Sequence, residues 1–333
     1  MRDRRPSSTR RQFRPALRLL PLLLLFRLSG SFAAAQEEPG RETGPLRHVL
    51  IPGNPRSGDP VTLVIGAAWE GEDALLINGE GNTLTRTRFF DAAGVPGLEN
   101  FRAAVLAVPS TARPGPAVIS IEKKGKKTAE IPLVIGERSF ASEEIVLNET
   151  LTGLRTVPDP RKAAESRHLW EILSAVGDQI YYTGTFLPPV ASTRRTGFFG
   201  DRRVFKYSDG TSNTAIHAGV DYGVPAGTGV RACGSGKVVL ARPRIVTGNS
   251  VVIEHLPGVY SLYYHLDRID AVEGTLVQAG TLLGLSGATG LATGPHLHWE
   301  LRVSGENTDP DAFLARPILD KDAVLAKMNE SGL

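Results

Sequence analysis

The chain has 333 residues, 41% of them hydrophobic and 22% charged, which is enough for two packed domains of ordinary size. Its 36 Gly and 23 Pro follow no period, which excludes collagen and favours a turn-rich, mainly β protein, and the single Cys233 excludes an intrachain disulfide and a cysteine-based metal site. The net charge of +3 comes from residues 1–28, which hold eight Arg and one acid; the 30 basic and 34 acidic residues that remain carry about −4, so no nucleic-acid partner is expected.

The N-terminal residues have the three parts of a secretory signal peptide. An Arg-rich segment runs to Arg18, a short apolar run follows at 19–26, and Ala33-Ala34-Ala35 forms a cleavage site of the A-x-A kind. The apolar run is far shorter than the roughly 20 residues that span a bilayer. We therefore expect residues 1–35 to be removed near Ala35 and the protein to be exported to the periplasm or cell envelope. An uncleaved anchor and a mitochondrial presequence are the alternatives.

Residues 36–47 are expected to form a flexible tether before a first β domain at 48–138. Short β-rich runs separated by turn signals lie at 61–65, 74–77, 84–89, 103–108, 117–121 and 131–135, with a hairpin tip at 123–127. Such short strands without a helical pattern predict an immunoglobulin-like β-sandwich. Its only histidine, His48, is expected at the surface or at a strand end. A cell-envelope protein partner, if present, would bind through this domain.

A helical connector is expected at 139–185. Asp159-Pro160 is typical of an N-cap followed by Pro at the first helical position. An apolar stripe with helical spacing follows at Leu169, Ile172, Leu173 and Val176. Gly177 is expected to stop this helix, which would pack on one of the domains and leave His168 in solvent.

Residues 186–316 are expected to form a second all-β domain, followed by a C-terminal tail at 317–333. Candidate strands lie at 230–232, 236–241, 250–254, 260–265, 281–285 and 297–302. Gly-rich links between them leave no room for crossover helices, which excludes a doubly wound α/β sheet. Residues 204–213 are expected to form a loop.

Five of the seven histidines lie in this second domain. His217 and Asp221 form a His-x-x-x-Asp pattern, and His296 and His298 form a His-x-His pattern. Residues i and i+2 of a strand point to the same face, so His296 and His298 can reach one metal site. Imidazole and carboxylate ligands suit zinc, and a catalytic zinc keeps three protein ligands and one position for water. His265, at the end of an aromatic strand, lies between the two patterns in the sequence.

The stretch from about Phe186 to Phe313 resembles the lysostaphin/LytM-type zinc endopeptidases, metallopeptidase family 23. The matching segments are residues 197–203, 217–223, 225–228, 236–239, 263–266 and 287–300. The first β domain and the connector resemble, more weakly, the N-terminal region of some exported members. The resemblance therefore implies an antiparallel β LytM-type peptidase domain at 186–316.

The resemblance also implies residue roles. It implies that His217, Asp221 and His298 hold one Zn²⁺ per chain, and that His265 and His296 are the two catalytic histidines beside the water and the scissile carbonyl. Family members cut peptide bonds in the stems or cross-bridges of bacterial peptidoglycan. The implied function is an exported zinc metalloendopeptidase with peptidoglycan peptide as its substrate.

Two other functional readings are weighed against this one. The alternative from a different class is a non-catalytic LytM-like module that binds cell wall or activates a hydrolase. Among other zinc peptidases, the thermolysin-like class is disfavoured because His-Glu-x-x-His is absent, and the D-alanyl-D-alanine peptidases have a wider His-to-Asp spacing.

Several chemically active residues of the second domain are expected to lie outside the site. Cys233 is expected to be a buried or half-buried thiol, and His255 to be structural or exposed. Trp299 should face the core because it alternates with His298. Aromatic packing is the expected role of three tyrosines, Tyr222, Tyr263 and Tyr264.

Overall fold

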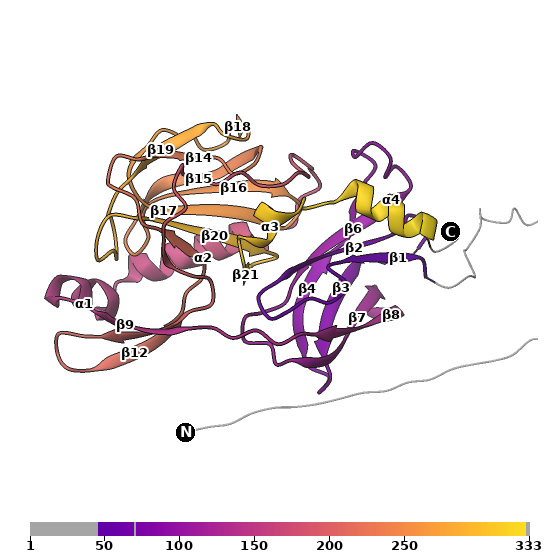
Figure 1. The fold of residues 1–333 in the computed structure, drawn as a ribbon, viewed down its shortest axis with the longest axis horizontal. Helices are drawn as coiled ribbons and strands as arrows, with labels where there is room; N and C mark the ends of the chain where they lie inside the picture. The colour runs from indigo at the N-terminus through magenta and orange to yellow at the C-terminus, as the bar shows by residue number, and fades with distance from the viewer. Residues whose placement is uncertain (1–45, 70, 331–333) are drawn as a thin grey trace, which may run out of the picture. The chain divides into compact units, whose positions relative to one another are not determined.

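The computed structural model describes residues 46–69 and 71–330, so the predicted signal peptide and almost all of the predicted tether lie outside the described residues. Strands dominate the described part of the chain, which confirms the mainly β class (Figure 1). Within that part, no helix has the length and apolar character needed to cross a membrane.

Two four-stranded antiparallel sheets form the first β domain. One sheet has the order β1-β2-β6-β5, with β1 (His48–Ile51), β2 (Pro60–Gly66), β5 (Phe90–Asp91) and β6 (Phe101–Ala107). The other has the order β4-β3-β7-β8, with β3 (Asp73–Asn78), β4 (Thr83–Arg88), β7 (Gly115–Lys123) and β8 (Lys126–Ile135). Buried side chains from both sheets, such as Leu63 and Ile119, join one apolar cluster. The six predicted strands and the hairpin tip are confirmed, and the immunoglobulin-like topology stays a prediction.

The predicted helix of the connector is confirmed as α2 (Pro160–Ser174), which follows a second, unpredicted helix, α1 (Glu149–Thr156). The Asp159 side chain accepts a hydrogen bond from the N–H of Arg161, as an N-cap does. Leu173 is buried against the sheet of the second domain, and His168 is exposed, as expected.

The predicted stop at Gly177 is wrong. The helix ends at Ser174, with Ala175 as its C-cap, and the hydroxyl of Tyr260 donates a hydrogen bond of 2.7 Å to the carbonyl of Ala175. A side chain distant in sequence satisfies this end of the helix, so no glycine is needed.

The loop predicted at 204–213 is also wrong. The chain there forms most of a hairpin of β11 (Arg202–Lys206) and β12 (Ser212–Ile216), and β9 (Ser142–Val146) from the connector pairs with β11 in parallel. The result is a three-stranded sheet with the order β12-β11-β9. Local sequence gives little sign of it because β9 lies about sixty residues upstream of its partner, as in the pair Arg203 and Glu143.

The second domain is built on a ten-stranded sheet whose main path runs β10-β13-β20-β17-β16-β15-β18. Its strands are β10 (Arg195–Gly197), β13 (Val220–Tyr222), β14 (Gly229–Arg231), β15 (Gly236–Arg244), β16 (Gly248–Leu256), β17 (Val259–Ile269), β18 (Leu276–Val277), β19 (Leu282–Ser286), β20 (Leu297–Val303) and β21 (Glu306–Thr308). All six predicted strands are present. Large buried side chains, among them Trp299 and Tyr263, form the core against this sheet.

The C-terminal residues add α3 (Ala312–Ala315) and α4 (Lys321–Glu330). Val324 and Met328 of α4 are buried, and the backbone carbonyl of Ile318 accepts a hydrogen bond of 2.8 Å from the hydroxyl of Thr62 in β2. Arg138 also pairs with Asp309. These contacts bring the end of the chain onto the first β domain.

Candidate metal centre and cleft

Strand register places the central residues of the site in one row. Asp221 in β13 lies directly opposite His298 in β20, and His298 lies opposite Tyr264 in β17. Directly opposed residues of antiparallel strands share a face of the sheet, so the three side chains project together. His217 comes from the end of β12 in the three-stranded sheet, and its backbone N–H donates to the carbonyl of Asp201.

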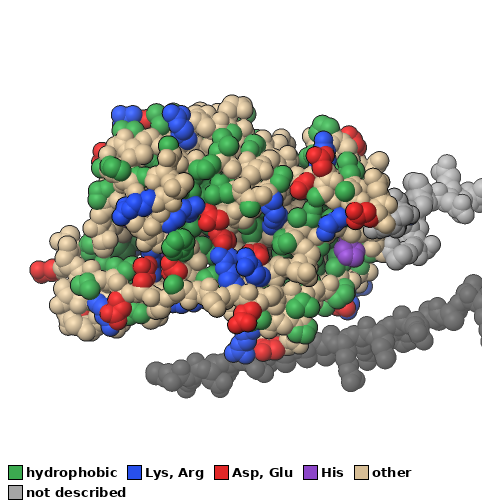
Figure 2. Space-filling view, viewed as in Figure 1, with side chains coloured by type: hydrophobic (Ala, Val, Ile, Leu, Met, Phe, Trp, Pro, Cys, Tyr) green, Lys and Arg blue, Asp and Glu red, His purple; other side chains and the backbone are tan. Residues whose placement is uncertain are grey.

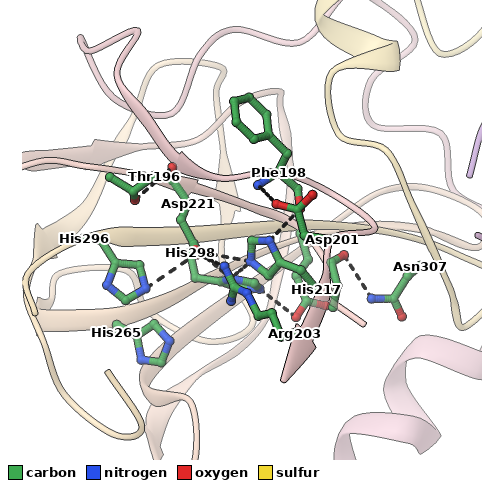
Figure 3. Close-up of polar contacts among 12 residues, drawn as sticks. Thr196, Phe198, Asp201, Arg203, His217, Asp221, His265, His296, His298 and Asn307 are labelled. Carbon is green, nitrogen blue, oxygen red and sulfur yellow. Dashed lines mark hydrogen bonds and ion pairs between the residues drawn. The ribbon is translucent and has the colours of Figure 1, made fainter. Parts of the chain in front are cut away.

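The side chains of His217, Asp221 and His298 converge, with ligand atoms that all lie within 4.8 Å of one another (Figure 3). Nε2 of His217 lies 3.0 Å from Nδ1 of His298 and 3.2 Å from Oδ1 of Asp221, which is 2.8 Å from Nδ1 of His298. All three residues are buried, with 3 to 8% of their surface exposed.

In His217 and His298, the ring nitrogen that points away from the centre is hydrogen-bonded, and this bond determines where the ring proton lies. Nδ1 of His217 lies 2.7 Å from the carbonyl oxygen of Phe198, which can only accept, so this nitrogen carries a proton. Nε2 of His298 lies 3.0 Å from Oε1 of Glu300 and is likewise a donor to an ionised carboxylate. The lone pairs of His217 Nε2 and His298 Nδ1 therefore face each other and the Asp221 carboxylate. A cation is needed between them, and two imidazoles with one carboxylate are a donor set that fits zinc.

The electrostatics around these residues favour a bound cation. Burial alone would raise the pKa of Asp221, but its contacts with His217 and His298 hold that pKa well below the usual value. Arg203 donates from Nη2 to Oδ2 of Asp221 at 2.6 Å and orients the carboxylate. Burial also opposes charge on His298, yet Asp221 and Glu300 outweigh it and raise its pKa to about 9. Without a metal, a proton on His298 is thus the cation that the site holds.

His265 and His296 lie beside this centre, with ring centroids 4.8 Å apart. Nδ1 of His265 lies 2.8 Å from the backbone carbonyl oxygen of Thr289, and Nδ1 of His296 lies 2.8 Å from that of Gly294. The Nδ1 atoms are therefore donors, and both Nε2 atoms are left as acceptors. Nε2 of His296 is 3.7 Å from Oδ1 of Asp221. Burial, followed by the neighbouring histidines, lowers the pKa of His265 to about 3, so its ring is neutral near pH 7.

The backbone of His265 explains how it reaches the site. In a regular strand the side chain of His265 would point to the opposite face of the sheet, because its neighbour Tyr264 lies on the same face as His298 and Asp221. The register between β16 and β17 shifts at this point, and His265 has a left-handed φ of 61°. This bulge turns the imidazole back to the same side as Tyr264. Such a backbone is uncommon for a residue other than glycine, and here it places a chemically active ring.

These residues lie in a cleft of about 580 Å³. One wall is a face of the three-stranded sheet, where Glu143 and Arg203 are paired across strands and Ile145 and Phe205 follow in the next row. The segments 246–247 and 291–294 also line the cleft. Neither this wall nor its Glu143–Arg203 ion pair was predicted from the sequence. Arg203 is the last residue of the matching segment 197–203, but nothing in the sequence near it indicates that Glu143 is its partner.

Three of the residues expected outside the site, Cys233, His255 and Trp299, are buried as predicted, whereas Tyr264 lines the cleft. Cys233 and His255 are fully buried; burial raises the pKa of the Cys233 thiol to about 12 and lowers that of His255 to about 4. His255 has a structural role, with Nδ1 near the carbonyl of Ser235 and Nε2 near the hydroxyl of Ser261. Trp299 is buried in the core.

The three tyrosines pack as predicted, but Tyr264 packs against the site. Tyr222 and Tyr263 are buried in the core cluster. The ring of Tyr264 stacks on that of His298, with centroids 5.7 Å apart and an interplanar angle of 4°. Its cross-strand position opposite His298 explains this contact.

The comparisons with known proteins agree with the fold and the site. Residues 215–310 match the model of peptidase family M23. The chain is 36% identical over 127 residues to "DD-carboxypeptidase/endopeptidase Mpg" of Neisseria meningitidis serogroup B, which is 38% of this chain and 28% of that protein. It is 39% identical over 129 residues to "Peptidoglycan DD-endopeptidase ShyA" of Vibrio cholerae, 39% of this chain and 29% of that protein.

A solved structure of a putative peptidase M23 from Pseudomonas aeruginosa shares the fold more widely. The match has a TM-score of 0.55 and 24% sequence identity, and it covers 78% of this chain and 94% of the Pseudomonas aeruginosa chain. The chain spans less than a third of the length of the curated relatives named above. The matched residues contain His217, Asp221, His265, His296 and His298. Residues 215–310 therefore form the part of this chain that matches peptidase family M23.

Proposed function

We propose that this protein is an exported zinc metalloendopeptidase that hydrolyses peptide bonds in bacterial peptidoglycan. The observation that carries the proposal is the convergence of two imidazole lone pairs and one carboxylate on a single point, beside two further histidines in an open cleft. The names of the relatives, which include a peptidoglycan DD-endopeptidase, support the substrate class.

In this proposal His217 Nε2, Asp221 Oδ1 and His298 Nδ1 hold the zinc. The bound zinc supplies Lewis acidity toward a carbonyl oxygen and lowers the pKa of a water molecule toward 7. The chain supplies what surrounds it. Phe198 and Glu300 fix the two ring orientations from outside, and Arg203 holds the Asp221 carboxylate in place.

His265 and His296 provide the acid and base function. In the neutral form of each ring, Nδ1 carries the proton because it faces a backbone carbonyl, and Nε2 is the atom that can accept a proton. One ring accepts the proton of the attacking water, and a protonated ring returns it to the leaving amine. The left-handed backbone at His265 is a further sign that its position is selected for chemistry.

The domain organisation belongs to the same proposal. Residues 1–35 are proposed as a signal peptide cleaved near Ala35, 36–47 as a tether, 48–138 as an immunoglobulin-like domain, 139–185 as the connector, 186–316 as the peptidase domain and 317–333 as the tail. The first domain is proposed as the surface for a cell-envelope protein partner. On the face drawn in Figure 2, basic and acidic side chains are intermixed, which suits a protein without a nucleic-acid partner.

The test is mass spectrometry of muropeptides released from purified peptidoglycan by residues 36–333 loaded with zinc. Release of peptides cut at an amide bond supports hydrolysis and identifies the bond. A chelator should stop the release, and so should the variant His296→Ala. Zinc-loaded protein that binds peptidoglycan but releases nothing would favour the alternative, a non-catalytic module that binds the wall or activates another hydrolase.

A further inference from the structure

The cleft beside the metal centre is lined by three arginines, and they differ in how their charge is balanced. The lining arginines are Arg155, Arg194 and Arg203, and the lining carboxylates are Glu143, Asp221 and Glu300. Arg203 pairs with both Glu143 and Asp221. Glu300 is bound by Arg302, with Nε 2.8 Å from Oε2, and by His298. Every carboxylate of the cleft is therefore matched to a cationic partner.

Arg194 and Arg155 have no carboxylate partner among the residues that the structure describes. The side chain of Arg155 is held in place by neutral groups: Nε donates to the hydroxyl of Tyr207 at 3.0 Å, and the guanidinium lies 3.9 Å from the ring centroid of Phe205. Arg194 is exposed, and the bonds that fix it belong to its backbone, whose carbonyl accepts from Gly223 at 3.0 Å. The cleft thus holds two guanidinium groups that are not paired with a carboxylate of the described chain.

The side chain of Arg194 lies in a space that a glycine leaves open next to the metal-ligand strand. Gly223 follows β13, two residues after Asp221, and a Cβ there would meet the guanidinium of Arg194 and come within 2.7 Å of Cγ2 of Thr196. Gly223 does not need a left-handed backbone, because its φ is outside that region. Because Gly223 has no side chain, the guanidinium of Arg194, which lines the cleft, can lie against the backbone there.

We infer that this cleft selects peptides that carry a free carboxylate near the scissile bond, and that Arg194 is the specificity-determining residue that binds it. The inference rests on the proposed function, since it names the substrate class of the same site. A guanidinium without an acidic partner is the group best suited to bind a carboxylate through two parallel hydrogen bonds. Peptidoglycan stem peptides supply such carboxylates, and amidation converts them to neutral amides of almost the same shape.

The test compares two fluorescein-labelled, cross-linked stem peptides of the same sequence, one with free carboxylates and one with all of them amidated. With zinc-loaded wild-type protein, kcat/KM should be about tenfold higher for the carboxylate peptide. Arg194→Gln should lose about that factor for the carboxylate peptide and leave the amidated peptide unchanged, while Arg194→Lys should retain part of the preference. Arg167→Gln, an exposed arginine of α2 outside the cleft, is the matched control and should change neither.

Binding of both peptides to the zinc-loaded His265→Ala variant, with and without Arg194→Gln, separates recognition from hydrolysis. The proposal is overturned if wild-type protein treats the two peptides alike, or if Arg194→Gln weakens both equally. If no peptide is cleaved, the proposed function fails, and the Kd values decide recognition: a tenfold preference that Arg194→Gln abolishes supports it, and equal Kd values overturn it.

Discussion

Asp221 and His298 are direct cross-strand partners in β13 and β20, although 77 residues separate them in the chain, and Oδ1 of Asp221 lies 2.8 Å from Nδ1 of His298. The register of two strands therefore fixes two of the three candidate metal ligands. His217 is added from the end of β12, four residues before Asp221. The site depends on how closely β13 docks along β20.

Gly219 permits that docking. A Cβ at this position would collide with the backbone carbonyl of Trp299, which cannot move without moving β20. We expect Gly219→Ala to lower the free energy of unfolding by about 1–3 kcal/mol and to weaken zinc binding, because it forces β13 away from its partner. Denaturant unfolding and zinc titration measure both effects. Gly94→Ala, where a Cβ meets nothing within 4 Å, is the control. Equal stability and affinity in the two variants would show that the docking is not as tight as described.

Glu300 is expected to act as a positioning residue for His298. Its Oε1 accepts from Nε2 of His298, and its Oε2 accepts from Arg302. In Glu300→Gln the carboxylate charge is lost, and we expect zinc affinity to fall about 10- to 100-fold. Competition with a chromophoric chelator measures this change. Glu144→Gln, a surface carboxylate paired with Lys206, is the matched control. An unchanged affinity in Glu300→Gln would show that Glu300 does not position His298 for zinc.

Zinc binding is expected to release a proton. The pKa of His298 is raised to about 9 in the metal-free site, above the ordinary value, so the ring is protonated at pH 6 and becomes neutral only as the pH rises through 9. A metal on Nδ1 must displace that proton. Calorimetry at pH 6 in buffers with different ionisation enthalpies should report about one proton released per zinc. A proton count near zero would contradict the assignment of Nδ1.

His255 is expected to make stability depend on pH. Burial lowers its pKa to about 4, so the folded protein keeps it neutral while the unfolded chain protonates near 6.5. The contribution of His255 to the free energy of unfolding is therefore highest above pH 6.5. It falls by up to roughly 3 kcal/mol as the pH drops toward 4, because only the unfolded chain binds the proton in this range. Denaturant unfolding of wild-type protein and of His255→Leu across this range isolates the effect. The variant should be less stable at pH 7 but less sensitive to acid; parallel curves would contradict the prediction.

The sequence predicted the strands of both domains well because their side chains alternate and turn residues separate them. His296 and His298 were expected to share a site, and the structure brings them to the same centre, with His296 just before the first residue of β20. The position of His265 beside them could not be derived from alternation, because it depends on a bulge and a left-handed backbone.

Features that depend on distant partners were predicted poorly. β11 and β12 form part of a sheet completed by β9, so the local pattern at 204–213 indicated only a loop. The end of α2 is satisfied by Tyr260, which no local pattern reveals. The same reason explains why the wall of the cleft and its arginines were missed: its residues come from the connector, from the hairpin and from the segment before β10.

The most direct test of the proposed zinc centre is a zinc titration of metal-free protein with release of muropeptides as the readout. We expect activity to rise in proportion to added zinc, to reach a plateau at one equivalent, and to be absent at every zinc level in His217→Ala and His298→Ala. Full activity in the chelated protein or in either variant would contradict the proposed zinc centre.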